Sequence, residues 1–276
     1  MSSAVSTPVA AHPFDQAVAL QLQPDGHWLG HTSPAYANMV GPYGGITAAQ
    51  MLNAVLLHPK RLGDPLALTV NYAAGVADGP FVLQARPART NRSTQHWVIE
   101  LLQDGQSVIT ATAITAQRRD TWGVDDEPMP ACPAPADVPS LRVAAPVVWF
   151  DRYETKPITG PLPVTWDGSS QNSLSQLWVR DQPARPLDFA SLAAVADIFF
   201  PRVWRRRATH VPAGTVSMTV YFHARAAQLA ATGTGFVLAQ ARAQAFRNGF
   251  FDQTAQLWNE AGEMLVTSHQ IVYYKA

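Results

Sequence analysis

The sequence contains little cysteine, and this shortage excludes several kinds of site. Cys132 is the only cysteine, so no disulfide can form within the chain and no metal or redox site can be built from paired cysteines. A catalytic thiol is not expected either, because prolines surround Cys132. Lysine is also scarce, at positions 60, 156 and 275 only, but arginine supplies the other basic residues. The formal net charge is zero, so we expect no nucleic-acid partner.

Charge of either sign is also scarce. Charged residues make up 14% of the chain, compared with about a quarter in typical proteins, and this favours a homo-oligomer that buries further surface. No apolar run is long enough to span a bilayer, and residues 1–13 lack the basic and then apolar stretches of a signal peptide. We therefore expect a cytoplasmic protein.

The first half of the chain predicts a long apolar helix followed by strands. Residues 46–57 are rich in Ala and Leu without a helix breaker, and Pro59 and Pro65 lie beyond the helix. The hydrophobic period then changes to two, which predicts antiparallel strands over residues 66–72, 81–86, 95–102 and 107–118. Asp104 and Gly105 form the expected hairpin turn between the last two strands.

A proline-rich segment separates this half from the next. Nine prolines lie between residues 121 and 163, together with an acidic cluster at residues 125–127. We interpret the segment as a long connection that crosses the surface. Inside it, the alternation of residues 147–153 predicts one short strand.

The pattern of the first half then returns. A strand is predicted over residues 174–180 and a helix over residues 186–200, with Pro186 in its first turn. Residues 68–72 align with residues 218–222 in this repeat, although few residues are identical. The other predicted strands of the second half run over residues 215–224, 235–246, 251–259 and 264–274.

The fold class predicted from this repeat is α+β. We expect two units, at residues 14–120 and 164–276, joined by the connection at residues 121–163. Two β-sandwich domains would also supply many strands, but they would leave the two apolar helices unexplained. A helix that is apolar on all sides can be buried if a sheet curls round it, which is the hot-dog architecture. Two such units in one chain would pair their sheets as a pseudo-dimer.

Three polar residues of the second half stand in apolar surroundings. Asp197 interrupts the predicted helix, where a carboxylate must face solvent, meet a partner or lose free energy on burial. Gln270 shares a face of the last strand with Ser268, and its amide can hold a water or a carbonyl group. The hydroxyl of Thr215 can orient a water. Each residue also has a structural interpretation: a solvated stripe, a satisfied polar group and simple β-propensity, respectively.

In their order and spacing these segments resemble the acyl-CoA thioesterase II family, the double hot-dog thioesterases. The resemblance runs from about Tyr43 to the C-terminus and is weakest across the proline-rich connection. Its motifs are the Ala-Asp pair at residues 196–197, the strand from Thr215 to the Tyr-Phe-His of residues 221–223, and a Gln after Thr-Ser-His at residues 267–270. The resemblance implies that Asp197, Thr215 and Gln270 form the catalytic trio.

The activity that the resemblance implies is hydrolysis of acyl-CoA to a free acid and CoA, by direct attack of water and without a cofactor or metal. The sequence agrees, because it has neither a Gly-x-Ser-x-Gly nor a His-Glu-x-x-His motif. The first half lacks the trio, since Pro65, Ala113 and approximately Asn53 fall at the corresponding positions. We expect the first half to complete the pocket.

Two further groups are candidates for substrate binding. Gly44 and Gly45 precede the first helix, where backbone N–H groups suit an oxyanion, or else they form only a tight turn. The arginines between the second helix and the Thr215 strand could meet the phosphates of CoA, or else they lie on a solvated loop; they are Arg202, Arg205, Arg206 and Arg207.

Two other functions remain open on the same fold. An enoyl-CoA hydratase of the MaoC type would need a His five residues after the Asp, and Arg202 occupies that position. A non-catalytic acyl-binding protein would keep the pocket without turnover, and the intact trio argues against it.

Overall fold

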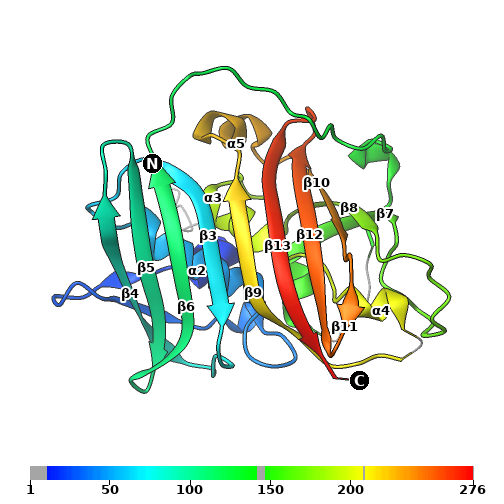
Figure 1. Ribbon diagram of the computed structural model, residues 1–276, viewed down its shortest axis with the longest axis horizontal. Coiled ribbons are helices and arrows are strands. Elements are labelled where there is room, and N and C mark those ends of the chain that lie inside the picture. The colour runs from blue at the N-terminus through cyan, green and yellow to red at the C-terminus, as the bar shows by residue number, and fades with distance from the viewer. Residues whose placement is uncertain (1–10, 142–146, 208, 276) are drawn as a thin grey trace, which may run out of the picture.

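One continuous antiparallel sheet forms the front of the molecule and two helices lie behind it (Figure 1). The computed structural model describes residues 11–141, 147–207 and 209–275. Within these ranges the sheet has 13 strands, in the order β1-β2-β4-β5-β6-β3-β9-β13-β12-β10-β8-β7, with β11 paired to β12. The central helices are α2 (Gly44–Leu56) and α3 (Phe189–Val195), and the main hydrophobic core lies between them and the sheet.

The strands fall into two sets, one from each half of the chain. The first set comprises β1 (Gln21–Leu22), β2 (Trp28–His31), β3 (Asp64–Tyr72), β4 (Pro80–Thr90), β5 (Thr94–Gln103) and β6 (Gln106–Ala116). The second set comprises β7 (Tyr153–Thr159), β8 (Ser175–Asp181), β9 (Ala213–Phe222), β10 (Val237–Arg242), β11 (Phe246–Arg247), β12 (Phe250–Asn259) and β13 (Met264–Tyr274).

The two halves join at the pair β3 and β9. Thr69 lies directly opposite Thr219, and their hydroxyl oxygens are 3.0 Å apart. These two threonines are also equivalent in the sequence repeat, and a residue that pairs with its own equivalent marks a local twofold axis. The structure therefore confirms the predicted α+β double hot-dog, in which two units form a pseudo-dimer.

The first central helix agrees with its prediction, whereas the second is shorter than predicted. α3 begins at Phe189, because Asp188 accepts a hydrogen bond from the Ser191 backbone N–H and caps the helix there. It ends at Val195 instead of residue 200, and the next N–H groups make tighter bonds, such as Asp197 N–H to Ala194 O at 3.1 Å. Asp197 consequently lies in a turn after the helix and not within it.

The strand predicted over residues 147–153 is wrong. Residues Val148–Arg152 form a 3-10 helix, and the strand β7 starts only at Tyr153. The reason is tertiary packing, since Trp149 stacks on Tyr43 with ring centroids 4.1 Å apart. β7 pairs with β8, so the end of the proline-rich connection is part of the second half's sheet.

The strand predicted over residues 235–246 is also interrupted. β10 ends at Arg242 and β11 starts at Phe246, because the Asp252 carboxylate accepts the backbone N–H groups of Gln244 and Ala245 in between. Three short helices complete the fold: α1 (Pro13–Ala17), α4 (Val203–Arg206) and α5 (Ala226–Thr232). None of the helices in the described residues is long and apolar enough to span a membrane.

Candidate active site

Asp197, Gln270 and Thr215 meet behind the sheet. Gln270 donates a hydrogen bond from Nε2 to Asp197 Oδ1 at 2.8 Å, and Thr215 donates from Oγ1 to Gln270 Oε1 at 3.3 Å. The Gln270 amide therefore lies between the other two side chains and makes one contact with each. These three residues come from three different elements, so only the fold brings them together.

Strand geometry directs Gln270 and Thr215 to the same side. Gln270 is 3% exposed and faces the helices, and it shares this buried face of β13 with Ser268 and Val272, as the period of two predicts. On β9 the register shifts between Thr215 and Ser217, which leaves Val216 as an extra residue. Such a bulge re-aims the neighbouring side chain. Thr215 is thereby paired with the buried Val272 and faces inwards, whereas Ser217 is paired with an exposed residue.

Asp197 lies against the N-terminus of the helix from the other half. A Cβ atom added to Gly44 would lie 2.8 Å from Asp197 Oδ2, so only glycine leaves room for the carboxylate. A Cβ atom on Gly45 would lie 2.5 Å from the backbone oxygen of Ala194, so that glycine permits the close approach of α2 and α3. The Tyr72 hydroxyl donates a hydrogen bond to Gly44 O at 2.9 Å and holds this helix start in place.

The surroundings of Asp197 favour its neutral form more than water does. Burial raises the pKa of Asp197 from its ordinary value of 3.8 to about 7, although hydrogen bonds from Gln270 and from the Gly45 backbone N–H act in the opposite direction. Burial, and secondarily the charge of Asp197, raises the pKa of Tyr43 and Tyr72 well above 10. Both phenols thus stay neutral donors beside a carboxyl group that titrates near neutral pH.

A cavity of about 730 Å³ opens beside the three side chains, which all line it together with Gly44. This volume is typical of sites that enclose a small organic ligand. Most of the other walls are apolar and aromatic. They include the stacked pair of Tyr43 and Trp149 on one side, and Phe200 and Trp204 on another. The arrangement is a mainly apolar cavity in which Asp197, Gln270 and Thr215 form one hydrogen-bonded polar group at the wall.

Sequence reasoning missed several residues of this wall. Tyr72 and Gln253 line the cavity, and Gln253 lies opposite Gln270 on the neighbouring strand. Arg202 was expected to meet the CoA phosphates, but it is fully buried and instead donates a hydrogen bond to Ser175 Oγ at 2.7 Å. Burial lowers the pKa of Arg202 to about 9. The positions of Tyr72 and Gln253 in the wall depend on strand pairing, so no local sequence signal identifies them.

The arginines at residues 205–207 do not line this cavity. Arg205 donates hydrogen bonds to Ser170 Oγ at 3.0 Å and to Pro161 O at 3.3 Å, and so holds the preceding loop. Arg206 is exposed and lines a second, outer pocket. Arg207 is the C-cap residue of α4 and is half-buried.

Two family models match the chain, and each covers one half. The model described as the acyl-CoA thioesterase N-terminal domain matches residues 33–116, and the model described as the acyl-CoA thioesterase C-terminal domain matches residues 126–274. A search of curated proteins found no match.

Solved structures with the same fold span nearly the whole chain. A conserved protein of unknown function with a hot-dog fold from Alicyclobacillus acidocaldarius is 46% identical, with a TM-score of 0.92 over 97% of this chain and 99% of that one. An acyl-CoA thioesterase II from Mycobacterium marinum is 17% identical, with a TM-score of 0.73 over 95% and 98% of the two chains. The tesB protein of Mycobacterium avium subspecies paratuberculosis is 17% identical, with a TM-score of 0.77 over 96% and 100%.

Proposed function

Because this chain belongs to the acyl-CoA thioesterase family and is therefore a thioester hydrolase, we propose that it cleaves acyl-CoA to a free acid and CoA by direct attack of water. The observation that carries this proposal is the hydrogen bond from Gln270 to Asp197 at the wall of the 730 Å³ cavity. It holds the only carboxylate among the lining residues in one orientation, next to space that an acyl thioester can fill.

In the proposed mechanism Asp197 is the general base. A pKa of about 7 leaves much of the carboxyl group ionised at neutral pH and still basic enough to take a proton from water. Gln270 fixes Oδ1 of the carboxylate, and Thr215 keeps Gln270 in that orientation while its hydroxyl oxygen can hold the water. The role of the two neighbours is therefore positioning, which is worth as much as the proton transfer itself.

The reaction balances without a further reactant. The water oxygen bonds to the thioester carbonyl carbon while one water proton passes to Asp197. When the tetrahedral intermediate collapses, the carbon–sulfur bond breaks and the electron pair leaves with the CoA sulfur. The proton on Asp197 can then pass to that thiolate, which restores the carboxylate.

The oxyanion of the tetrahedral intermediate needs a hydrogen-bond donor. We propose that the backbone N–H of Gly44 is this donor. α2 has no side chain capping its N-terminus, so its first N–H groups have no partner within the helix. The Gly45 N–H already interacts with Asp197, whereas Gly44 lines the cavity directly. The positive end of the helix dipole also favours an anion there.

The experiment is release of free thiol from a series of acyl-CoAs of increasing chain length, by the wild type and Asp197→Asn in parallel. Asparagine keeps the size of the side chain and an oxygen for Gln270, but it cannot accept the proton. We expect kcat to fall roughly 10²–10⁴-fold in a variant that still unfolds cooperatively on heating. Wild-type turnover by a folded Asp197→Asn protein would refute the role of Asp197. Saturable acyl-CoA binding without turnover by the wild type would instead indicate an acyl-binding protein.

For the CoA phosphates, the three arginines at residues 205–207 remain our proposed contacts, with Arg206 the best placed. Both Arg205 and Arg206 donate hydrogen bonds to Ser170, but only Arg206 lines the outer pocket. Replacing all three with alanine should raise KM for acyl-CoA. An unaltered KM would remove this part of the proposal.

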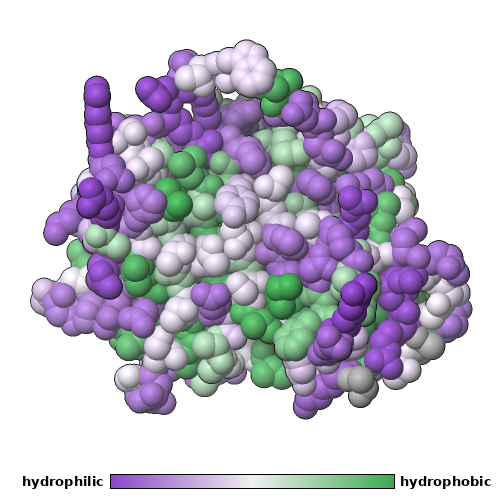
Figure 2. All heavy atoms as spheres, in the orientation of Figure 1, coloured by the Kyte–Doolittle hydropathy of each residue, from purple (hydrophilic) through white to green (hydrophobic). Residues whose placement is uncertain are grey.

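We also propose that the enzyme is a cytoplasmic homo-oligomer. Large apolar side chains are exposed on the central strands β9 and β13, among them Tyr221 at 51%, Ile271 at 43% and Val216 at 40%. Figure 2 shows hydrophobic and neutral residues over the middle of this face of the sheet. Exposed large apolar side chains on one face of a sheet favour association. Light scattering on the eluted protein measures the mass, and the mass of a single chain would contradict the proposal.

A further inference from the structure

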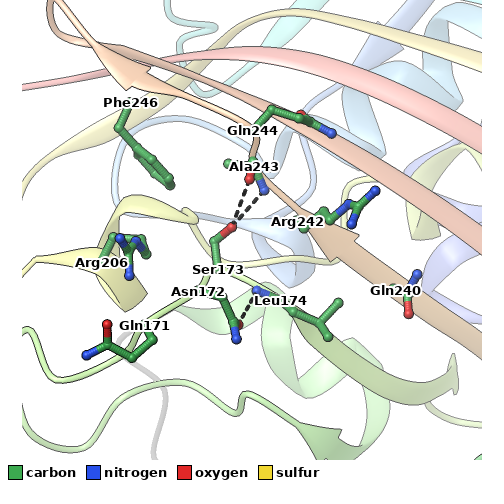
Figure 3. Close-up of a pocket in the computed structure, with 10 residues that line it drawn as sticks. All are labelled: Gln171, Asn172, Ser173, Leu174, Arg206, Gln240, Arg242, Ala243, Gln244 and Phe246. Atoms are coloured by element: carbon green, nitrogen blue, oxygen red, sulfur yellow. Dashed lines mark hydrogen bonds between the residues drawn. The ribbon is translucent and has the colours of Figure 1, made fainter.

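A second pocket, of about 520 Å³, lies outside the catalytic cavity (Figure 3). Its walls come from the loop before β8, from α4, and from β10 and the break that follows it. The lining residues are Gln171, Asn172, Ser173, Leu174, Arg206, Gln240, Arg242, Ala243, Gln244 and Phe246. Unlike the catalytic cavity, it is lined mainly by amides, hydroxyl and guanidinium groups and contains one aromatic ring.

The pocket carries an excess of positive charge. Arg206 and Arg242 line it from opposite sides of Ser173, and none of its lining residues is acidic. Neither arginine forms an ion pair with any carboxylate in the described part of the chain. Two guanidinium groups without a carboxylate are suited to a ligand with phosphate groups, because a guanidinium matches a phosphate with paired hydrogen bonds.

The pocket walls are held by hydrogen bonds of their own. Ser173 Oγ accepts the Ala243 N–H at 2.8 Å and donates to Ala243 O at 3.2 Å, which ties the loop to the end of β10. Asn172 Oδ1 accepts the Leu174 N–H at 3.0 Å, so the amide nitrogen of Asn172 remains available as a donor. The ring of Phe246 packs against Phe251 at 5.4 Å, which fixes it as one wall.

The same elements line the catalytic cavity on their other side. On α4, Trp204 lines the cavity and Arg206 lines the outer pocket. Phe251, against which Phe246 packs, also lines the cavity. The two spaces therefore lie side by side, so the apolar end and the phosphorylated end of one elongated ligand could reach one space each.

We infer that the outer pocket binds the phosphorylated adenosine end of acyl-CoA. Arg206 and Arg242 bind the phosphate groups, and the Phe246 ring offers a face on which the adenine can stack. Side-chain amides such as that of Asn172 suit the hydrogen-bonding edge of adenine. This inference rests on the proposed thioesterase function for its choice of ligand, and it adds Arg242 and Phe246 to the proposed substrate contacts.

The test is calorimetric titration of the full-length protein with adenosine 3′,5′-bisphosphate, which needs no turnover. Arg242→Ala and Arg206→Ala should each weaken binding about tenfold, because each removes a charge-assisted contact. Arg247→Ala is the matched control, since Arg247 is exposed on β11 and does not line the pocket, and it should bind like the wild type. Equal binding by wild type and Arg242→Ala, or equal weakening by Arg247→Ala, would overturn the inference.

Inhibition and steady-state kinetics show whether the outer pocket binds the nucleotide part of acyl-CoA or a separate ligand. Adenosine 3′,5′-bisphosphate should compete with acyl-CoA, and Arg242→Ala should raise KM for acyl-CoA about tenfold but leave KM for the matching acyl-pantetheine, which has no nucleotide, unchanged. A bisphosphate that binds without competing would assign the pocket to a separate ligand and would overturn the inference. Failure to hydrolyse either thioester would refute the proposed function, while the titration would still test the pocket.

Discussion

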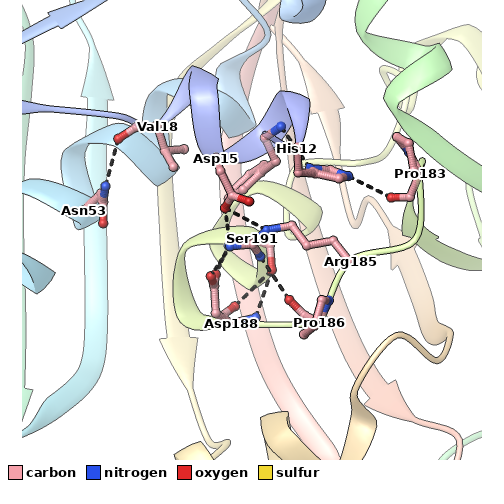
Figure 4. Close-up of polar contacts among 10 residues, drawn as sticks. His12, Asp15, Val18, Asn53, Pro183, Arg185, Pro186, Asp188 and Ser191 are labelled. Atoms are coloured by element: carbon pink, nitrogen blue, oxygen red, sulfur yellow. Dashed lines mark hydrogen bonds and ion pairs between the residues drawn. The ribbon is translucent and has the colours of Figure 1, made fainter. Parts of the chain in front are cut away.

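The two central helices occupy equivalent places in the two halves, but their N-termini differ. At α3, Asp188 and Ser191 cap the helix reciprocally, and Arg185 bridges Asp188 to Asp15 of the N-terminal helix (Figure 4). At α2 no neighbouring side chain caps the helix. Instead, Asp197 from the other half accepts the backbone N–H of Gly45. A pseudo-dimer with two helix starts thus has one start closed by its own cap and one open to a cavity.

The C-terminal ends of α2 and α3 also differ, in what the polar residue at each end contacts. Asn53, near the end of α2, donates to Val18 O at 2.8 Å and so fastens the N-terminal segment (Figure 4). Asp197, beyond the end of α3, faces the cavity. The polar residue near the end of one helix serves packing and the other is our proposed general base, so we expect one active site for each chain.

The strongest way to test this comparison is to remove the polar partner in each half. Gln270→Ala should lower kcat about 100-fold, because Asp197 loses the donor that orients it. Asn53→Ala should leave kcat unchanged and lower only the melting temperature. Steady-state kinetics with one acyl-CoA compares them, and an equal loss of kcat in both proteins would argue against a single catalytic half.

The pH dependence of kcat/KM should follow the titration of Asp197, which lies at the N-terminus of α2. With a pKa of about 7, Asp197 becomes protonated below neutral pH, and kcat/KM should fall about tenfold for each pH unit below 7. Gln270→Ala should move this midpoint upwards, because the hydrogen bond from Gln270 lowers the pKa. A profile that is flat between pH 5 and pH 8 would contradict the assignment of the base.

The stability of the folded protein should also depend on this titration, but it should fall with rising pH, whereas kcat/KM should rise. Burial raises the pKa of both Asp197 and Asp181 to about 7, so between about pH 4 and pH 7 the folded protein binds more protons than the unfolded chain. Stability should therefore decrease as pH rises through this window. In thermal melts Asp197→Asn should remove part of that decrease, and an identical pH dependence in the variant would contradict the raised pKa.

A smaller effect is expected from closing the open helix start. Gly44→Ala places a Cβ atom at 2.8 Å from Asp197 Oδ2, and we expect kcat to fall about tenfold as the carboxylate moves. Gly75→Ala is the control, because Gly75 also lines the cavity but has open space around the added atom. Equal kcat values for the two variants would show that the approach to Gly44 does not matter.

The smallest effect on kcat should come from removing the side-chain cap at the N-terminus of α3. Asp188→Ala removes the cap of α3 and should cost about 1 kcal/mol of stability with little change in kcat. Asp15→Ala, which removes only the half-exposed partner of Arg185, should cost less. Chemical denaturation measures both values, and a large loss of kcat in Asp188→Ala would mean that the two helix starts are coupled.

Particular residues show how far prediction from the sequence reached. The α2 helix was predictable because its Ala- and Leu-rich stretch has no breaker. On β13 the period of two predicted that Gln270 shares a face with Ser268 and Val272, but not that this face points inwards. The end of α3 was not predictable, since residues 196–200 are as apolar as the helix before them. The strand expected at residues 147–153 failed because the stacking of Trp149 on Tyr43 outweighs local alternation.

The sequence by itself therefore determined the two halves, the buried helices and the strands, because hydrophobic period and turn residues act over short distances. Its resemblance to a family also pointed to Asp197, Thr215 and Gln270. Only the tertiary structure decided that these side chains meet, through a bulge at Val216 and a helix start contributed by the other half. The physical reason is that hydrogen bonding, burial and the resulting pKa of Asp197 depend on neighbours that are distant along the chain.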